Sequence, residues 1–183
     1  MLKNQERSKY FNFALKALDI YRNIIALVVL WSLWALFFSS IETIIVGKVI
    51  LSFVAIALSI GPVLVDFNES HASNPLWTGH ARFHLVWQVC ALAMSGLMVL
   101  SLMWLIPTYT NLLISISLLY MWIICFFIAC FSMSLYGGKL NDVNGVPPIK
   151  TSFFGKQIEI DHNLSGITGA FILCTYACAL IFL

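Results

Sequence analysis

The sequence is poor in charged residues. Aspartate, glutamate, lysine and arginine together make up 10% of its 183 residues, whereas a soluble globular domain carries about 25%. Hydrophobic residues account for 61% of the chain. This composition excludes a soluble domain and predicts an integral membrane protein whose first partner is the lipid bilayer.

Two further absences narrow the class of protein. The five cysteines all fall inside apolar runs, with no C-x-x-C pair and no C-x-x-C-H haem-attachment site, so we expect no disulfide framework. The net charge is only +2, and no basic cluster is interleaved with aromatic residues. No nucleic-acid partner is therefore expected.

What the sequence does contain is five apolar runs, and a membrane-spanning helix needs about 20 apolar residues. We expect one domain, residues 1–183, that forms an all-α, polytopic membrane helix bundle with five transmembrane helices. Small residues on one face of the last span would let another helix approach closely, which leaves a homo-oligomer open. The expected spans are residues 24–38, 49–65, 85–106, 112–136 and 164–183.

The segments between these runs differ in character. Residues 1–23 are the most basic stretch and interleave charged with apolar side chains, which predicts an interfacial helix leading into the first span. Residues 39–48 are expected to form a short turn. The longer loops are residues 66–84 and 137–163, and within the second of these Thr151 to Ile160 predicts a small hairpin that turns at Gly155.

The distribution of basic residues predicts the orientation in the membrane. Five spans place residues 1–23, 66–84 and 137–163 on one side, and that side holds nine of the ten lysines and arginines. Only Lys48 lies on the other side. The positive-inside rule then puts the N-terminus and both long loops in the cytoplasm, and the C-terminus on the opposite side. All four histidines share the cytoplasmic side.

The stretch from Asn74 to His84 is the candidate functional motif. Asn74-Pro75 favours a turn, and Thr78 fits the N-cap of the third helix. His80 and His84 are four residues apart, so their imidazoles share one helix face, and Gln88 continues that face. The candidate substrate-pocket residues are Trp77, Trp87 and Gln88.

Topology brings further titratable residues to the same membrane interface. We expect His80, His84 and His162 to converge with at least one carboxylate, because helices hold all three histidines at fixed positions. His71 is expected to be peripheral, since it lies on a loop that does not fix its direction. The carboxylate candidates are Asp66, Glu69 and Asp161.

Three chemical interpretations of this set remain open. The first is a metal site in which His80, His84, His162 and Asp66 bind zinc or non-haem iron. The second is metal-free transfer of a proton by a histidine and a carboxylate. The third is structural, with His80 and His84 reaching to phospholipid headgroups and the tryptophans in the interfacial belt.

The motif also carries resemblances. The run N-P-L-W-T-G-H-A-R-F-H, Asn74 to His84, resembles an N-P-x-W-x-x-H-A-x-F-H signature of small, uncharacterised multi-span membrane proteins of bacteria and fungi. The resemblance implies that Asn74, Trp77, His80 and His84 belong to one unit. The H-x-x-x-H box is also similar to one box of membrane desaturases and hydroxylases, which carry more histidines than this chain. The chain also resembles small five-helix sterol isomerases of the emopamil-binding class, which place His and acidic residues in a helix bundle beside aromatic side chains. No residue-by-residue match accompanies this resemblance.

These observations lead to two functional hypotheses. The first is a small membrane enzyme that acts on a hydrophobic or lipid-like substrate through a His/carboxylate site at the cytoplasmic interface, with or without a metal. The second is a non-enzymatic membrane module, either a lipid- or ligand-binding protein or a subunit of a larger complex. A pocket lined by the site residues would favour the enzyme, and a solid bundle would favour the module.

Overall fold

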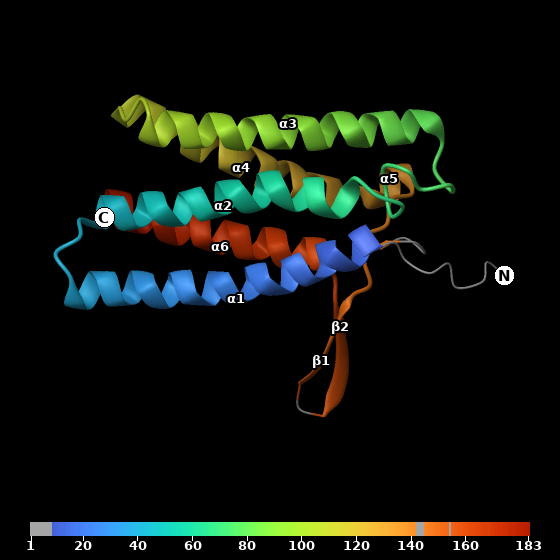
Figure 1. Ribbon diagram of the computed structural model, residues 1–183, viewed down its shortest axis with the longest axis horizontal. Helices are drawn as coiled ribbons and strands as arrows, with labels where there is room; N and C mark the ends of the chain where they lie inside the picture. The colour runs from blue at the N-terminus through green and yellow to red at the C-terminus, as the bar shows by residue number, and fades with distance from the viewer. Residues whose placement is uncertain (1–8, 142–144, 154) are drawn as a thin grey trace.

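The computed structural model describes residues 9–141, 145–153 and 155–183. In this part of the chain, five long helices lie side by side, and each is long and apolar enough to cross a membrane (Figure 1). The predicted all-α membrane helix bundle is therefore confirmed. The long helices are α1 (Lys9–Phe38), α2 (Thr43–Asp66), α3 (Gly79–Trp104), α4 (Tyr109–Phe131) and α6 (His162–Phe182). Helix α5 (Met133–Tyr136) and strands β1 (Ile149–Phe153) and β2 (Lys156–Ile160) lie between α4 and α6.

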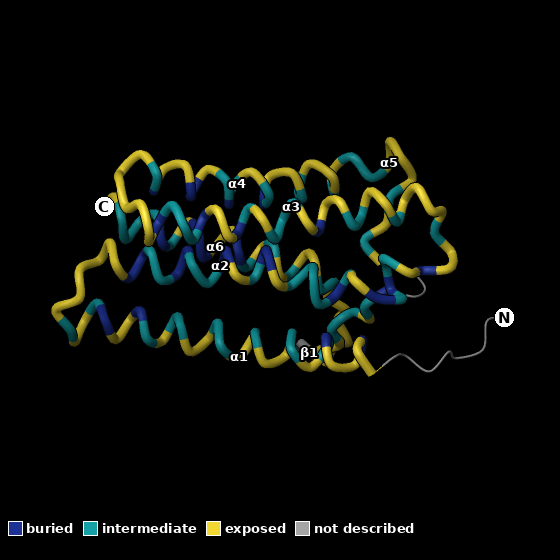
Figure 2. The backbone as a smooth tube through the Cα atoms, turned by 45° about the horizontal axis from the view of Figure 1, so that its top comes forward, coloured by how far each residue is buried: buried dark blue, intermediate teal, exposed yellow. Residues whose placement is uncertain are grey.

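Helix α2 is the centre of the bundle, because α1, α3 and α6 all pack against it. Its buried residues recur every three or four positions and form one wide apolar stripe. Figure 2 shows buried backbone on the inward faces of the helices and exposed backbone along their outer faces. The core contains Ile50, Leu51 and Val54 of α2, Val99 and Met103 of α3, Leu119 and Ile123 of α4, and Cys174 and Ala177 of α6.

Two glycines let the neighbouring helices come close to α2. A Cβ atom on Gly96 of α3 would lie 1.5 Å from Ser59 Oγ and 3.0 Å from the Ala55 carbonyl oxygen of α2. A Cβ on Gly47 of α2 would lie 2.9 Å from the carbonyl oxygen of Ala177 in α6. In a bilayer the hydrophobic effect does not drive helices together, so their association depends on close packing. Small residues at the interface allow that packing.

The helix boundaries differ from the sequence-based expectation at two places. The turn predicted over residues 39–48 is shorter, since α2 already begins at Thr43. Lys48 is accommodated inside the helix because its ammonium lies 4.2 Å from the centre of the Trp104 ring, where cation–π attraction operates. The predicted interfacial helix and first span are one continuous helix, and residues 1–8 lie outside the described residues.

The predicted fourth span also divides into two helices. Helix α4 ends at Phe131, and the last residues of the predicted span form the separate helix α5. Ser132 is the C-cap of α4, and its backbone leaves the helical region at φ −98° and ψ 5°. Gly137, at φ 69°, then ends α5 with the left-handed conformation that favours glycine.

The predicted hairpin is confirmed. Strands β1 and β2 pair antiparallel, with Ile149 opposite Ile160 and Lys150 opposite Glu159. The turn uses Gly155 at φ 74°, a conformation that glycine adopts without steric cost. The hairpin projects sideways from the bundle (Figure 1).

The two long connections meet at one end of the bundle. The start of α1, the loop of residues 67–78, helix α5 and the base of the hairpin all lie at this end, which we call the polar end (Figure 1). The short α1–α2 and α3–α4 turns and the C-terminus lie at the opposite end. Helix α6 begins short of the level that α2 and α3 reach (Figure 1).

Candidate functional site

The loop of residues 67–78 is held by its own buried polar side chains. Asn68, Ser70 and Asn74 are all buried. The Asn68 amide donates to the Val65 carbonyl at 2.7 Å and accepts from the Ser70 N–H at 2.8 Å. The Asn74 amide donates to the Ser70 carbonyl at 2.9 Å. These Asx-type bonds replace the backbone hydrogen bonds that a regular element would supply.

The end of this loop starts α3. The Trp77 N–H donates to the Asn74 carbonyl at 3.2 Å, which closes a turn with Pro75 at its second position. The Thr78 hydroxyl then accepts from the Ala81 N–H at 3.2 Å. The predicted N-cap is therefore confirmed, and the cap sets the direction in which α3 leaves the loop.

A histidine and a carboxylate meet where α2 ends. The Nδ1 atom of His71 lies 3.3 Å from Asp66 Oδ1 and 2.7 Å from Ser70 Oγ. Since the Ser70 hydroxyl donates to the Val65 carbonyl at 3.1 Å, its oxygen is left to accept from His71. Nδ1 is then the protonated ring nitrogen in neutral His71, and Nε2 is the basic one. The Trp77 and His71 rings pack edge to face, with ring centres 5.3 Å apart.

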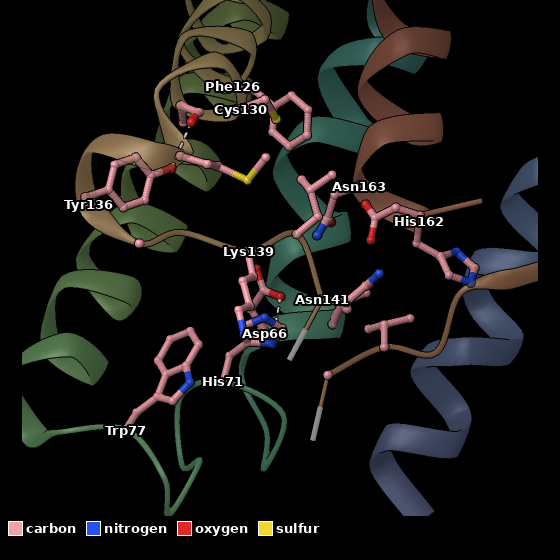
Figure 3. A pocket seen from close by; sticks show the side chains of 18 residues that line it. Asp66, His71, Trp77, Phe126, Cys130, Tyr136, Lys139, Asn141, His162 and Asn163 are labelled. Atoms are coloured by element: carbon pink, nitrogen blue, oxygen red, sulfur yellow. Dashed lines mark hydrogen bonds and ion pairs between the residues drawn. The ribbon is translucent and has the colours of Figure 1, made fainter. Parts of the chain in front are cut away.

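The pair lines a cavity of about 430 Å³ at the polar end (Figure 3), within the range of small-molecule sites. Its walls come from the end of α2, the loop of residues 67–78, the end of α4 with α5, the segment that follows α5, and the start of α6. Its apolar lining includes Phe126, Ala129 and Met133. The polar lining consists of Asp66, His71, Trp77, Cys130, Tyr136, Lys139, Asn141, Asp161, His162 and Asn163.

The two walls of the cavity have different chemistry. Asp66, His71 and Asn141 lie together on one side, while Phe126, Cys130 and Tyr136 lie on the other (Figure 3). The Tyr136 hydroxyl donates to the Ala129 carbonyl at 2.8 Å, which ties α5 to α4. The cavity thus offers a hydrogen-bonding side and a hydrocarbon-like side to one molecule.

Residues at the start of α6 take two different roles. Asp161 is the N-cap of α6, because its side chain accepts from the Leu164 N–H at 2.9 Å. The ring of His162 turns away from His71 toward α1 (Figure 3), where the charges of Asp19 and Arg22 act on it. These two α1 residues form an ion pair. Both Asp161 and His162 contribute to the rim rather than to the Asp66–His71 pair.

The structure does not bring His80 and His84 into this cavity. They lie exposed on the first turns of α3 and bond to each other, with 3.0 Å between their Nε2 atoms. The expected joint site with His162 and Asp66 is thus divided, and His71 takes the position beside Asp66 that was expected of the helical pair. Trp87 and Gln88 are exposed on α3 as well, and neither lines the cavity.

The geometry also bears on the four-ligand metal site. Among the described residues, which include every histidine and every candidate carboxylate, no three His, Cys, Asp or Glu side chains gather closely enough to hold a metal ion. Glu69 is half-buried on the 67–78 loop and is not among the cavity-lining residues. The proposed first sphere of His80, His84, His162 and Asp66 is therefore not assembled in this conformation.

Sequence reasoning missed several residues of the cavity. The polar ones are Cys130, Tyr136, Lys139 and Asn141, from the end of α4 and the segment after it, and Asn163 at the start of α6. For His71 a signal was present, because Asn68, Ser70 and Asn74 surround it at spacings typical of Asx turns. Such turns fix the direction of a loop side chain.

The comparisons with known proteins leave the site to be interpreted from its own chemistry. No protein-family model matches the chain, and no curated protein and no solved structure is significantly similar to it.

Proposed function

We propose that the protein is a small integral membrane enzyme that moves a proton on a lipid-like substrate, with Asp66 and His71 as the proton-transfer pair. The observation that carries the proposal is the contact between these two side chains on the wall of a 430 Å³ cavity. The Ser70 hydroxyl accepts from Nδ1–H at 2.7 Å and the Asp66 carboxylate lies 3.3 Å from the same nitrogen. Together they would fix the tautomer and orientation of the imidazole, so that Nε2 can act as the base.

The position of the cavity supports an amphiphile as the substrate. The cavity lies where apolar helices end, which is the level that the polar part of a lipid-like molecule occupies in a bilayer. Its apolar wall of Phe126, Ala129 and Met133 would face the chain of the molecule. Its polar wall would face the headgroup, and Lys139 at the rim would stabilise negative charge that develops on a substrate oxygen.

The motif residues of the loop would then act as one unit. Asn74 closes the loop from outside the cavity and would position the imidazole indirectly. Trp77 packs on His71 and also lines the cavity, so it would both position the imidazole and contact the substrate. Asp66, the last residue of α2, would supply the carboxylate of this unit. A membrane orientation with the polar end in the cytoplasm follows from the positive-inside rule and belongs to the same proposal.

The proposal is tested by replacing His71 in cells that produce the protein. Lipid extracts of membranes containing the parent protein are compared with extracts from cells lacking it and from cells producing His71→Gln or Asp66→Asn. We expect one amphiphile to accumulate in the absence of the protein and in both variants. Turnover of the isolated amphiphile by purified His71→Gln should fall by at least about 100-fold, the lower range for losing a general acid or base.

A matched control and a solvent isotope separate the alternatives. The double variant His80→Ala, His84→Ala alters two exposed histidines outside the cavity and should turn over the amphiphile at the parental rate. Reaction in D₂O should place deuterium in the product if His71 passes a proton to carbon. Identical lipid profiles in all strains, with an unchanged amphiphile bound to the purified protein, would instead establish the non-enzymatic binding module.

A further inference from the structure

The exposed pair His80 and His84 stands apart from the cavity and has a geometry of its own. The two rings are nearly perpendicular, at 89°, and their Nε2 atoms are 3.0 Å apart. Without a third atom, this distance requires one ring to donate a hydrogen and the other to accept it. With both nitrogens unprotonated, two lone pairs would converge on a single point between the rings.

The surroundings hold His84 in the orientation that makes this convergence. The Trp87 ring stacks on His84 with centres 6.0 Å apart and planes 25° apart. Phe83 meets the same imidazole edge-on, with centres 5.7 Å apart. The Thr78 cap fixes the first turn of α3, which carries His80. The pair is thus directed by packing and by a capped helix, as a preorganised ligand pair requires.

We propose that His80 and His84 form a two-ligand site for a tetragonal divalent ion, Cu²⁺ or Ni²⁺. Metal–nitrogen bonds to histidine are about 2.0–2.1 Å long. Two such bonds to nitrogens 3.0 Å apart meet at close to a right angle, which is the angle of square-planar and tetragonal coordination rather than the wider tetrahedral angle. Imidazole ligands in that geometry select Cu²⁺ or Ni²⁺.

The remaining coordination positions would be taken by water, since both histidines are exposed. An exposed ion of this kind lies outside the cavity, so its binding is independent of turnover by Asp66 and His71.

The test uses the whole protein, purified in detergent with a tag that contains no histidine and freed of metal by a chelator. Cu²⁺ is titrated by calorimetry, and the bound ion is examined by electron paramagnetic resonance. We expect one ion per chain and hyperfine splitting from two imidazole nitrogens. His80→Ala and His84→Ala should each lower the affinity by at least about tenfold, as even loss of an outer partner of a ligand does.

The control variant is His162→Ala, which removes a histidine at the start of α6 and should leave Cu²⁺ affinity unchanged. Thermal unfolding of each variant in detergent verifies that it folds like the parent. In the His84→Ala background, Phe83→His rebuilds a pair at i, i+3 on one helix face and should recover part of the affinity. Equal Cu²⁺ affinity in the parent and in the His80→Ala, His84→Ala double variant would overturn the proposal, as would a spectrum with a single nitrogen in the parent.

Discussion

Asn74 carries out its role from a fully buried position in the 67–78 loop. Its amide donates to the Ser70 carbonyl at 2.9 Å, and its carbonyl oxygen accepts from the Leu76 N–H at 3.0 Å. The two bonds connect the part of the loop that carries His71 with the part that starts α3. Replacing such a side chain leaves its buried hydrogen-bond partners unsatisfied, and this lowers the free energy of unfolding.

We therefore expect Asn74→Ala to lower the free energy of unfolding by about 1–3 kcal/mol, the cost of unpaired buried polar groups. The loss should appear as a lower midpoint of thermal unfolding in detergent. Asn23→Ala, which alters an exposed amide on α1, is the matched control and should unfold like the parent. Equal midpoints for the two variants would show that the loop does not depend on the Asn74 bonds.

Residue positions were predictable where local geometry decides them. The Thr78 cap and the contact between His80 and His84 follow from helix periodicity, and both are present in the structure. The place of His71 depends on three bonded side chains in an irregular loop, and the Asx-turn spacing of these residues was the one sequence signal for it. Cavity residues such as Cys130 and Asn163 meet only through tertiary packing.

At the scale of the elements, apolar length was enough to predict five spans, and single residues decided where they end. Lys48 is accommodated within α2 because its ammonium makes a cation–π contact with the Trp104 ring of α3. Helix α4 ends at Ser132, whose backbone leaves the helical region while its hydroxyl bonds to the Ile128 carbonyl. Contacts of this kind join different helices or compete with the helix backbone, so hydropathy along the chain does not reveal them.

The contact between α2 and α3 provides a stability test at this scale. Gly96→Ala would force a methyl group against Ser59, whose Oγ lies 1.5 Å from the position of that Cβ. We expect a loss of about 1–3 kcal/mol, the range for overpacking a core, measured by thermal unfolding. Gly166→Ala on α6 is the control, because no atom lies within 4 Å of its added Cβ. If both variants unfold at the same temperature, α2 and α3 do not pack as closely as described.

At the scale of the whole molecule, both long connections lie at the polar end, as the five-span topology predicts. Of the described basic residues outside α1, Arg82, Lys139, Lys150 and Lys156 belong to this end, whereas Lys48 lies toward the other. The orientation in the membrane follows if the positive-inside rule governs insertion.

Labelling of single cysteines, introduced into a cysteine-free variant, would show on which side of the membrane the polar end lies. Ser73 and Lys156 are exposed at the polar end, so Ser73→Cys and Lys156→Cys should both be labelled by an impermeant reagent only after the membrane is opened. Glu42→Cys, in the α1–α2 turn, should be labelled in intact cells. Asn68 would be a poor probe, since it is 6% exposed. Labelling of Ser73→Cys and Lys156→Cys from opposite sides would contradict the bundle topology.

The local closure of the 67–78 loop has a consequence for the order in which the protein is assembled. Its bonds join residues that are near one another in sequence, so they can form without the helices that are synthesised later. Helices α2 and α3 can then enter the bilayer as a finished hairpin that already positions His71 beside Asp66. The cavity needs walls from α4, α5 and α6 as well. During synthesis the contact between Asp66 and His71 can therefore form early, and the cavity beside it forms only when the last helix docks.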